Sequence, residues 1–227
     1  MNILIIGATS GIGNSLYSHY ISCGNRVAIM GRRKNILDEI CAANPTDTLA
    51  LQVDSDINSF SNAFEEVVKS FQNIDLAILC AGIGELNEPL DIKQELATLS
   101  TNVVGWTNVV DTLYNHFEKT GKGHLVTITS VGGLQPTPIA PSYSASKAFQ
   151  INYTKSLQAK ARKTAITVTE IRPGLVDTRM AKGNGLFWVM PLDKVSKQII
   201  KAIDNKKKLC VVTKRWRILN YIVKHFL

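Results

Sequence analysis

The sequence predicts an α/β fold in which a single doubly wound domain is built around a mostly parallel sheet of seven strands. Three observations support this prediction. Short β-like runs alternate along the chain with longer segments whose apolar residues recur at helical spacing. Several short runs are continuously apolar, as strands covered by helices on both faces should be. The longest segments without periodicity each follow a strand, where ligands bind in sheets of this kind.

The expected elements follow one another without a repeat, a low-complexity stretch or a linker. The strands are expected, in chain order, at Asn2–Ile6, Arg26–Met30, Leu49–Val53, Leu76–Cys80, Gly123–Thr129, Ala165–Ile171 and Leu209–Thr213. The helices are expected at Ile12–Cys23, Lys34–Ala42, Ser59–Phe71, Lys93–Glu118, Ser144–Lys163 and Leu192–Asp204. The segments Ala81–Pro89, Val131–Pro141 and Pro173–Pro191 lack periodicity, so we expect them to be the loops that form a site.

Composition narrows the function classes. The 227 residues suit one domain, which we place at 1–213, with a short tail at 214–227. The four cysteines show no disulfide or metal spacing, and no apolar run approaches the ~18 residues of a spanning helix, so we expect a cytoplasmic protein without a bound metal. No basic stretch precedes the short apolar run at the start, so we expect no signal peptide.

The net charge of +8 is concentrated in the tail. Seven Lys and Arg residues, and no Asp or Glu, follow residue 205, whereas the first 205 residues hold 19 bases and 18 acids. A nucleic-acid-binding protein more often carries a broad basic face on its folded body. We therefore expect no nucleic-acid partner.

A glycine-rich turn follows the first expected strand, with the sequence Gly7-Ala-Thr-Ser-Gly11-Ile-Gly13. Glycines there allow a tight turn and let the main chain approach a pyrophosphate at the N-terminus of the next helix. We therefore expect a nucleotide cofactor to contact Gly7, Ser10, Gly11, Ile12 and Gly13. An ordinary strand–helix turn is the alternative, and the G-x-x-x-G-x-G spacing differs from the more common G-x-G-x-x-G.

Tyr143 and Lys147 form a Y-x-x-x-K pair at the start of an expected helix, so both side chains share one face. A free phenol has a pKa near 10, and lowering it by about three units takes roughly 4 kcal/mol. An ammonium about 4 Å away contributes on that order at an effective dielectric of ~20. A surface tyrosine beside a solvated lysine is the alternative, but Ser130 lies thirteen residues upstream at the end of a strand.

Together these motifs resemble the short-chain dehydrogenase/reductase family, with matches from the glycine-rich turn to Thr178. The resemblance implies a Rossmann-type domain and an NAD(P)-dependent oxidoreductase acting on a carbonyl/alcohol pair. It implies that Tyr143 gives a proton to the substrate oxygen and that Ser130 polarises that oxygen. Lys147 would tune Tyr143 and bind the nicotinamide ribose. Asn102 would support a proton path by holding a bent helix, whose main chain would anchor a water that leads from the lysine to solvent.

Further cofactor contacts follow from the same resemblance. The turn Pro173–Thr178 would bring the Val176 main chain and the Thr178 hydroxyl to the nicotinamide carboxamide. Ala81 and Gly82 would approach the cofactor closely, and Asp54 would contact the adenine. The chain departs from the family at two positions: Ile6 stands where a threonine is usual, and Cys80 replaces the asparagine of the N-A-G motif.

The end of the second strand predicts a preference for NADP(H) over NAD(H). NAD-binding folds carry an acid there for the ribose hydroxyls, whereas this chain has Gly31, Arg32 and Arg33. We expect Arg32 to bind the 2′-phosphate, with Arg33 as a further contact. Basic residues at a helix start oppose the helix dipole, so the cluster is mildly unfavourable without an anion.

Apolar loop residues favour a hydrophobic small-molecule substrate, with packing on the body or on another subunit as the alternative. They are Leu134, Pro136, Pro138, Ile139, Leu186, Phe187, Trp188 and Val189. A non-catalytic dinucleotide-sensing or interaction protein with the same fold is the alternative to an enzyme. The tail spaces Trp216, Leu219, Val223 and Phe226 along one helical face, opposite basic residues. We favour packing of this face on the body or in a homodimer or homotetramer over peripheral membrane contact.

Overall fold

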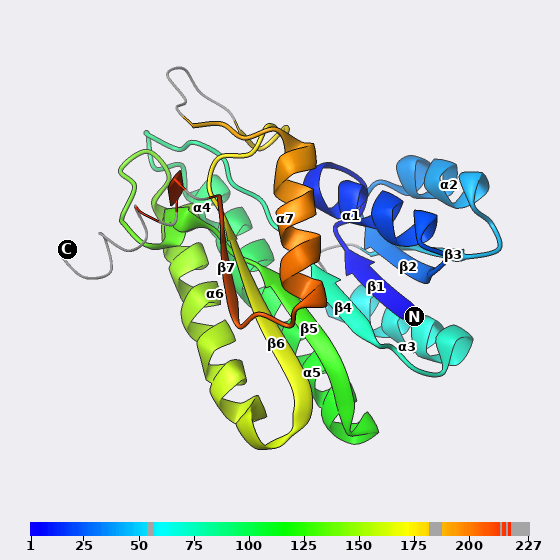
Figure 1. Cartoon of the computed structure of the whole chain (residues 1–227). Coiled ribbons are helices and arrows are strands. Elements are labelled where there is room, and N and C mark those ends of the chain that lie inside the picture. Colours follow the sequence, from blue (N-terminus) through cyan, green and yellow to red (C-terminus); the bar gives the residue numbers. More distant parts are fainter. Residues whose placement is uncertain (54–56, 182–187, 214, 217, 219–227) are drawn as a thin grey trace.

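The computed structural model describes residues 1–53, 57–181, 188–213, 215, 216 and 218. This part of the chain forms one parallel sheet of seven strands in the order β3-β2-β1-β4-β5-β6-β7 (Figure 1). The chain order reverses between β1 and β4, which is where a doubly wound sheet opens a crevice for a ligand. The strands are β1 (Asn2–Ile6), β2 (Arg26–Gly31), β3 (Thr48–Gln52), β4 (Leu76–Leu79), β5 (Lys122–Ile128), β6 (Ala165–Pro173) and β7 (Leu209–Val212).

Helices cover both faces of the sheet (Figure 1). They are α1 (Gly11–Ser22), α2 (Lys34–Ala43), α3 (Ile57–Phe71), α4 (Ile92–Leu99), α5 (Trp106–Thr120), α6 (Pro141–Lys160) and α7 (Leu192–Asp204). Alternate residues of β1 separate the two cores. Ile3 and Ile5 pack with α1, α2 and α7, whereas Leu4 and Ile6 pack with α3, α5 and α6. This two-sided burial explains why the strands are continuously apolar.

The prediction of one continuous helix at Lys93–Glu118 is wrong. It is divided into α4, a π-helical segment at Ser100–Gly105, and α5. The side chain of Asn102, fully buried in the π-helical segment, is hydrogen-bonded to the main chain of Ile83 and to Ser146. Apolar spacing does not reveal such a widened turn, because over so few residues it does not distinguish i→i+5 from i→i+4 hydrogen bonding.

Two other elements extend farther toward the site than predicted. Helix α6 begins at Pro141 rather than Ser144, with the proline in its first turn, where the missing N–H costs nothing. The sixth strand continues to Pro173, two residues beyond its expected end. Within the described residues, no helix is long and apolar enough to cross a bilayer.

Candidate active site

The glycine-rich turn brings two loops together at the carboxyl edge of the sheet. Gly7 has a positive φ of +88°, and a Cβ on it would lie 2.6 Å from the main-chain nitrogen of Ala81. At Gly13, a Cβ would overlap the carbonyl oxygen of Gly7. Larger residues would therefore separate the first strand from the loop after β4. A hypothetical Cβ on Gly11 would lie 3.3 Å from Thr178 Cγ2, which places the third loop beside the same turn.

A cavity of about 920 Å³ opens where these loops meet. Its volume is typical of a small-molecule or cofactor site. Ten of the residues expected to bind a cofactor line it: Gly7, Ser10, Gly11, Ile12, Gly13, Arg32, Arg33, Ala81, Gly82 and Thr178. Val176, also expected to contact the cofactor, is buried and pairs with Met190 through a parallel bridge. The expected adenine contact, Asp54, lies outside the described residues.

One arginine is held across the glycine-rich turn. The Arg33 guanidinium donates from Nη2 to Thr9 Oγ1 at 2.6 Å and to Ser10 Oγ at 2.8 Å, and from Nε to Thr9 Oγ1 at 3.1 Å. Arg32 is exposed at the cavity wall. We expected Arg32 to make the leading phosphate contact, whereas Arg33 is the arginine that is hydrogen-bonded to the turn. Thr9 was not among the expected site residues, although its position inside the motif could have suggested it.

Ser130, Tyr143 and Lys147 gather behind the loop that follows β4, and none of the three lines the cavity itself. Gly84 keeps this loop thin, because a Cβ there would lie 2.6 Å from the Tyr143 ring. Likewise, a Cβ on Gly82 would lie 3.5 Å from Lys147 Nζ. Only the main chain of this loop therefore separates the cavity from Tyr143 and Lys147.

Tyr143 lies in the first turn of α6, and its phenol has a raised pKa because burial disfavours the phenolate. A hydrogen bond with the Ser130 side chain acts in the opposite direction and lowers that pKa. Ser130 Oγ also accepts the main-chain N–H of Gly132 at 3.0 Å, which fixes the hydroxyl just beyond β5. The ammonium of Lys147 is 5.9 Å from the centre of the Tyr143 ring.

Lys147 is buried, and burial lowers the pKa of its ammonium to about 8. Its Nζ donates to Gln150 Oε1 at 2.9 Å and to the main-chain oxygen of Ile128 at 3.3 Å. Gln150 in turn donates from Nε2 to the main-chain oxygen of Asn102 at 2.8 Å. An amide side chain of α6 thus bonds to the main chain of the π-helical segment. The sequence argument missed Gln150, although it lies three residues after Lys147 on the same helical face.

Cys80 lies at the end of β4, beside the cavity and Lys147. Burial raises the pKa of its thiol to about 12, although the nearby Lys147 charge lowers it in part. The thiol is therefore protonated near neutral pH and acts as a small apolar group.

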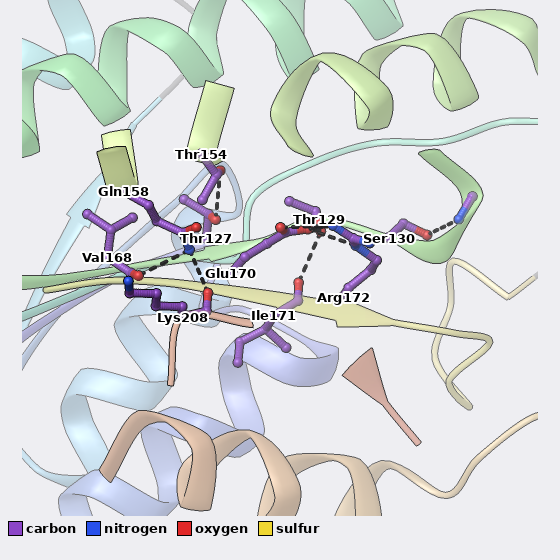
Figure 2. A network of polar contacts seen from close by, with 11 residues as sticks. Thr127, Thr129, Ser130, Thr154, Gln158, Val168, Glu170, Ile171, Arg172 and Lys208 are labelled. Atoms are coloured by element: carbon purple, nitrogen blue, oxygen red, sulfur yellow. Dashed lines mark hydrogen bonds and ion pairs between the residues drawn. The ribbon is translucent and has the colours of Figure 1, made fainter. Parts of the chain in front are cut away.

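A buried polar network supports the strand that ends at Ser130 (Figure 2). The Thr129 hydroxyl donates to Glu170 Oε1 at 2.8 Å and to the Ile171 main-chain oxygen at 3.2 Å. Glu170 is paired with Arg172 on the same face of β6, at 2.7 Å, and both are almost fully buried. The network joins β5 to β6 immediately before Ser130. Sequence reasoning missed it, because Glu170 and Arg172 lie within an apparent core strand.

The tail contacts the body at its first turn. Trp216 is buried, and its indole lies where a Cβ on Gly174 would be. Trp188, from the expected substrate loop, lies edge-on to Trp216 with ring centres 5.8 Å apart. Leu186, Phe187, Leu219, Val223 and Phe226 lie outside the described residues.

Comparison with known proteins gives concordant results. The family model for short chain dehydrogenases matches residues 1–186. An uncharacterized oxidoreductase of Staphylococcus epidermidis is 30% identical over 185 residues, covering 79% of this chain and 80% of the relative. One from Mycobacterium tuberculosis is 30% identical over 215 residues, covering 90% and 85%. A short-chain dehydrogenase structure from Burkholderia cenocepacia, in complex with NADP, has a TM-score of 0.86 at 20% identity, covering 99% and 93%.

Proposed function

Since the chain belongs to the short-chain dehydrogenase family and is an NAD(P)-dependent oxidoreductase of the CH–OH/C=O pair, we propose that it reduces a hydrophobic carbonyl compound with NADPH. The observation that carries this proposal is the convergence of Ser130, Tyr143 and Lys147 behind the glycine-lined cavity. A chain that only sensed a dinucleotide would have no chemical use for a phenol hydrogen-bonded to the Ser130 side chain behind the cavity.

The cavity fits a dinucleotide on two independent grounds. The turn around Gly7 and Gly13 leaves no room for side chains, so main-chain N–H groups can approach a pyrophosphate. The Arg33 guanidinium is already fixed beside the Ser10 hydroxyl, as a site for a phosphate dianion requires. We propose that the turn, Ala81, Gly82, Val176 and Thr178 hold the cofactor, and that Asp54 contacts its adenine.

When bound, the reduced nicotinamide would supply a hydride to the carbonyl carbon of the substrate. Ser130 donates a hydrogen bond to the carbonyl oxygen and polarises it. Tyr143 gives its phenolic proton to that oxygen as negative charge accumulates there, which yields the alcohol. Lys147 binds the ribose hydroxyls and its positive charge favours the resulting phenolate, while Asn102 supports the return of the proton. Oxidation of an alcohol runs the same steps in reverse.

Preference for NADPH follows from the end of β2. Gly31 stands where an acid would repel a 2′-phosphate, and two arginines follow it. Arg33 is fixed by Thr9 and Ser10, so it loses little conformational freedom on binding a phosphate. We therefore propose Arg33 as the leading contact and Arg32 as the second.

A hydrophobic substrate is supported by exposed apolar side chains on the loops after β5 and β6. Ile139, Met180 and Trp188 are 37%, 46% and 42% exposed. A screen of NADPH oxidation against aldehydes and ketones of increasing chain length tests both parts of the proposal. We expect turnover that rises with chain length and falls when NADH replaces NADPH. Tight NADPH binding with no turnover of any carbonyl would instead favour the sensing protein.

A homodimer or homotetramer is proposed because α4 exposes an apolar face. Ile92, Leu96 and Leu99 recur at helical spacing and are 64%, 58% and 37% exposed. Leu96→Lys should reduce the mass measured by sedimentation equilibrium, and an unchanged mass would count against this face.

We also propose that residues 1–213 form the catalytic domain and that the tail, 214–227, packs on it, as the buried Trp216 does. We propose a cytoplasmic protein, because its four cysteines are free thiols.

A further inference from the structure

The amide of Gln150 joins the lysine of the site to the π-helical segment. Gln150 is fully buried on α6, and both ends of its amide are bonded: Oε1 accepts from Lys147 Nζ at 2.9 Å, and Nε2 donates to the Asn102 oxygen at 2.8 Å. From this geometry we propose that Gln150 is a positioning residue, which holds the Lys147 ammonium in its charged form and in its place beside the cavity. The inference rests on the proposed function, because it assigns Lys147 a role in cofactor binding and proton transfer.

The amide is oriented by the main chain rather than by the lysine alone. The Asn102 carbonyl accepts only from a donor, so the NH2 end of Gln150 must face it and the oxygen must face Lys147. Asn102 is itself held in place, because its Oδ1 accepts from the main-chain N–H of Ile83 and its Nδ2 donates to the Ile83 carbonyl oxygen. The π-helical segment therefore sets the direction of a hydrogen-bond acceptor at the lysine.

An acceptor directed at the ammonium stabilises its charged form against burial. Burial lowers the pKa of Lys147 to about 8, and Ile128 supplies a second acceptor through its main-chain oxygen. Among the described residues, the titratable groups facing Lys147 are Cys80, from the end of β4, and Tyr143, on α6. Burial keeps both protonated and uncharged near neutral pH, so neither replaces the acceptor that Gln150 provides.

Two substitutions at position 150 should therefore act in opposite directions. Gln150→Leu keeps the volume and removes the acceptor, so Lys147 should lose its proton about one pH unit lower than in the native protein. Gln150→Glu gives up the donor to the Asn102 carbonyl but places a negative charge beside the ammonium, so the same transition should move upward by about one unit. A purely structural role predicts no such opposition of sign.

The first readout is NADPH affinity between pH 7 and 10, measured by the fluorescence of the bound coenzyme. Phosphate monoesters are already doubly ionised over this range, so their titration does not contribute. We expect affinity to fall as pH rises through the Lys147 transition, at a lower pH in Gln150→Leu and a higher pH in Gln150→Glu. The second readout is the alkaline limb of kcat/KM for carbonyl reduction, which should move in the same directions.

Gln158→Leu is the matched control. Gln158 lies nearer the C-terminal end of the same helix and also donates to main-chain oxygens, but to those of Val168 and Lys208 (Figure 2). Its pH profiles should match those of the native protein. Identical transitions in the native protein and both Gln150 variants would overturn the inference, and if Gln150→Leu does not fold, Gln150→Glu alone decides it. Shifted NADPH binding without turnover of any carbonyl would contradict the proposed function and leave the positioning role supported.

Discussion

The carboxylate of Glu95, on α4, accepts the main-chain N–H of Ser142 at 3.1 Å and so caps the helix that carries Tyr143. Helix α6 has no side-chain cap of its own, because its N-cap residue is Ala140. The other Glu95 oxygen accepts from the buried amide of Asn87 at 2.6 Å, which fixes the carboxylate. Glu95 of α4 thus stabilises the first turn of α6 at Ser142, the residue that precedes Tyr143.

Glu95→Ala should remove this cap and lower the free energy of unfolding by about 1–2 kcal/mol. It should also lower kcat more than it changes NADPH affinity, since Tyr143 loses its support while the glycine-rich turn is unaffected. Urea unfolding and steady-state kinetics measure the two effects. Gln94→Ala, at an exposed neighbouring position, is the control. Equal stability of the two variants would contradict the capping role.

Tyr143→Phe should reduce kcat by about 10²–10⁴-fold, because it removes the proton donor and leaves the ring. NADPH affinity should stay within about twofold, since the cavity is lined by other residues. Stopped-flow or steady-state NADPH oxidation gives the first value, and fluorescence titration gives the second. Full reductase activity in this variant would refute the assignment of the proton donor.

Arg33→Met should weaken NADPH binding about tenfold or more, since a charge-assisted hydrogen bond to the 2′-phosphate is lost. NADH, which lacks that phosphate, should bind almost as before. Arg32→Met provides the matched comparison and should have the smaller effect, because Arg32 is exposed and Arg33 is held by Thr9 and Ser10. Dissociation constants from calorimetry test the ranking, and a larger loss in Arg32→Met would reverse it.

Glu170→Leu should destabilise the protein by about 3–5 kcal/mol, because it removes the carboxylate that faces the buried Arg172 charge. The double variant Glu170→Leu/Arg172→Met should recover most of that loss, since no buried charge remains. Chemical unfolding of the native protein and the variants gives the comparison. If the double variant is no more stable than Glu170→Leu, the cost comes from packing and not from charge.

Acid should weaken the fold through His124, which is buried on β5 and bonded to Thr169 Oγ1 at 2.8 Å. Burial, with the Lys206 charge, lowers the pKa of its imidazole to about 4, against about 6.5 in the unfolded chain. The unfolded state therefore binds more protons between these values. Stability from the neutral imidazole is complete above pH 6.5 and is lost as pH falls toward 4.

The loss between pH 7 and pH 4 should be about 3 kcal/mol. Comparing unfolding free energies of the native protein and His124→Gln at both pH values isolates this contribution. The native protein should lose more stability on acidification than the variant. Parallel pH profiles would show that His124 does not carry the acid sensitivity.

Local chemistry made much of the fold predictable. The β1 strand was predicted at its observed bounds, Asn2–Ile6, because its residues 3–6 are all apolar and it ends at the glycines of a tight turn. The α7 helix was predicted at Leu192–Asp204 because its apolar residues recur at one helical face. The π-helical segment was not predicted, since Asn102 bonds to Ile83, nineteen residues away, and no local pattern records such a contact.

The sequence by itself determined the order of strands and helices, the glycine-rich turn, and the spacing of Ser130, Tyr143 and Lys147, because each depends on residues near one another in the chain. Only the tertiary structure decided that Arg33 lies across the turn, that Glu95 caps α6, and that Gln150 joins Lys147 to Asn102. These contacts are made by side chains from different elements. Their partners are set by the packing of helices on the sheet, which brings together residues that are distant in sequence.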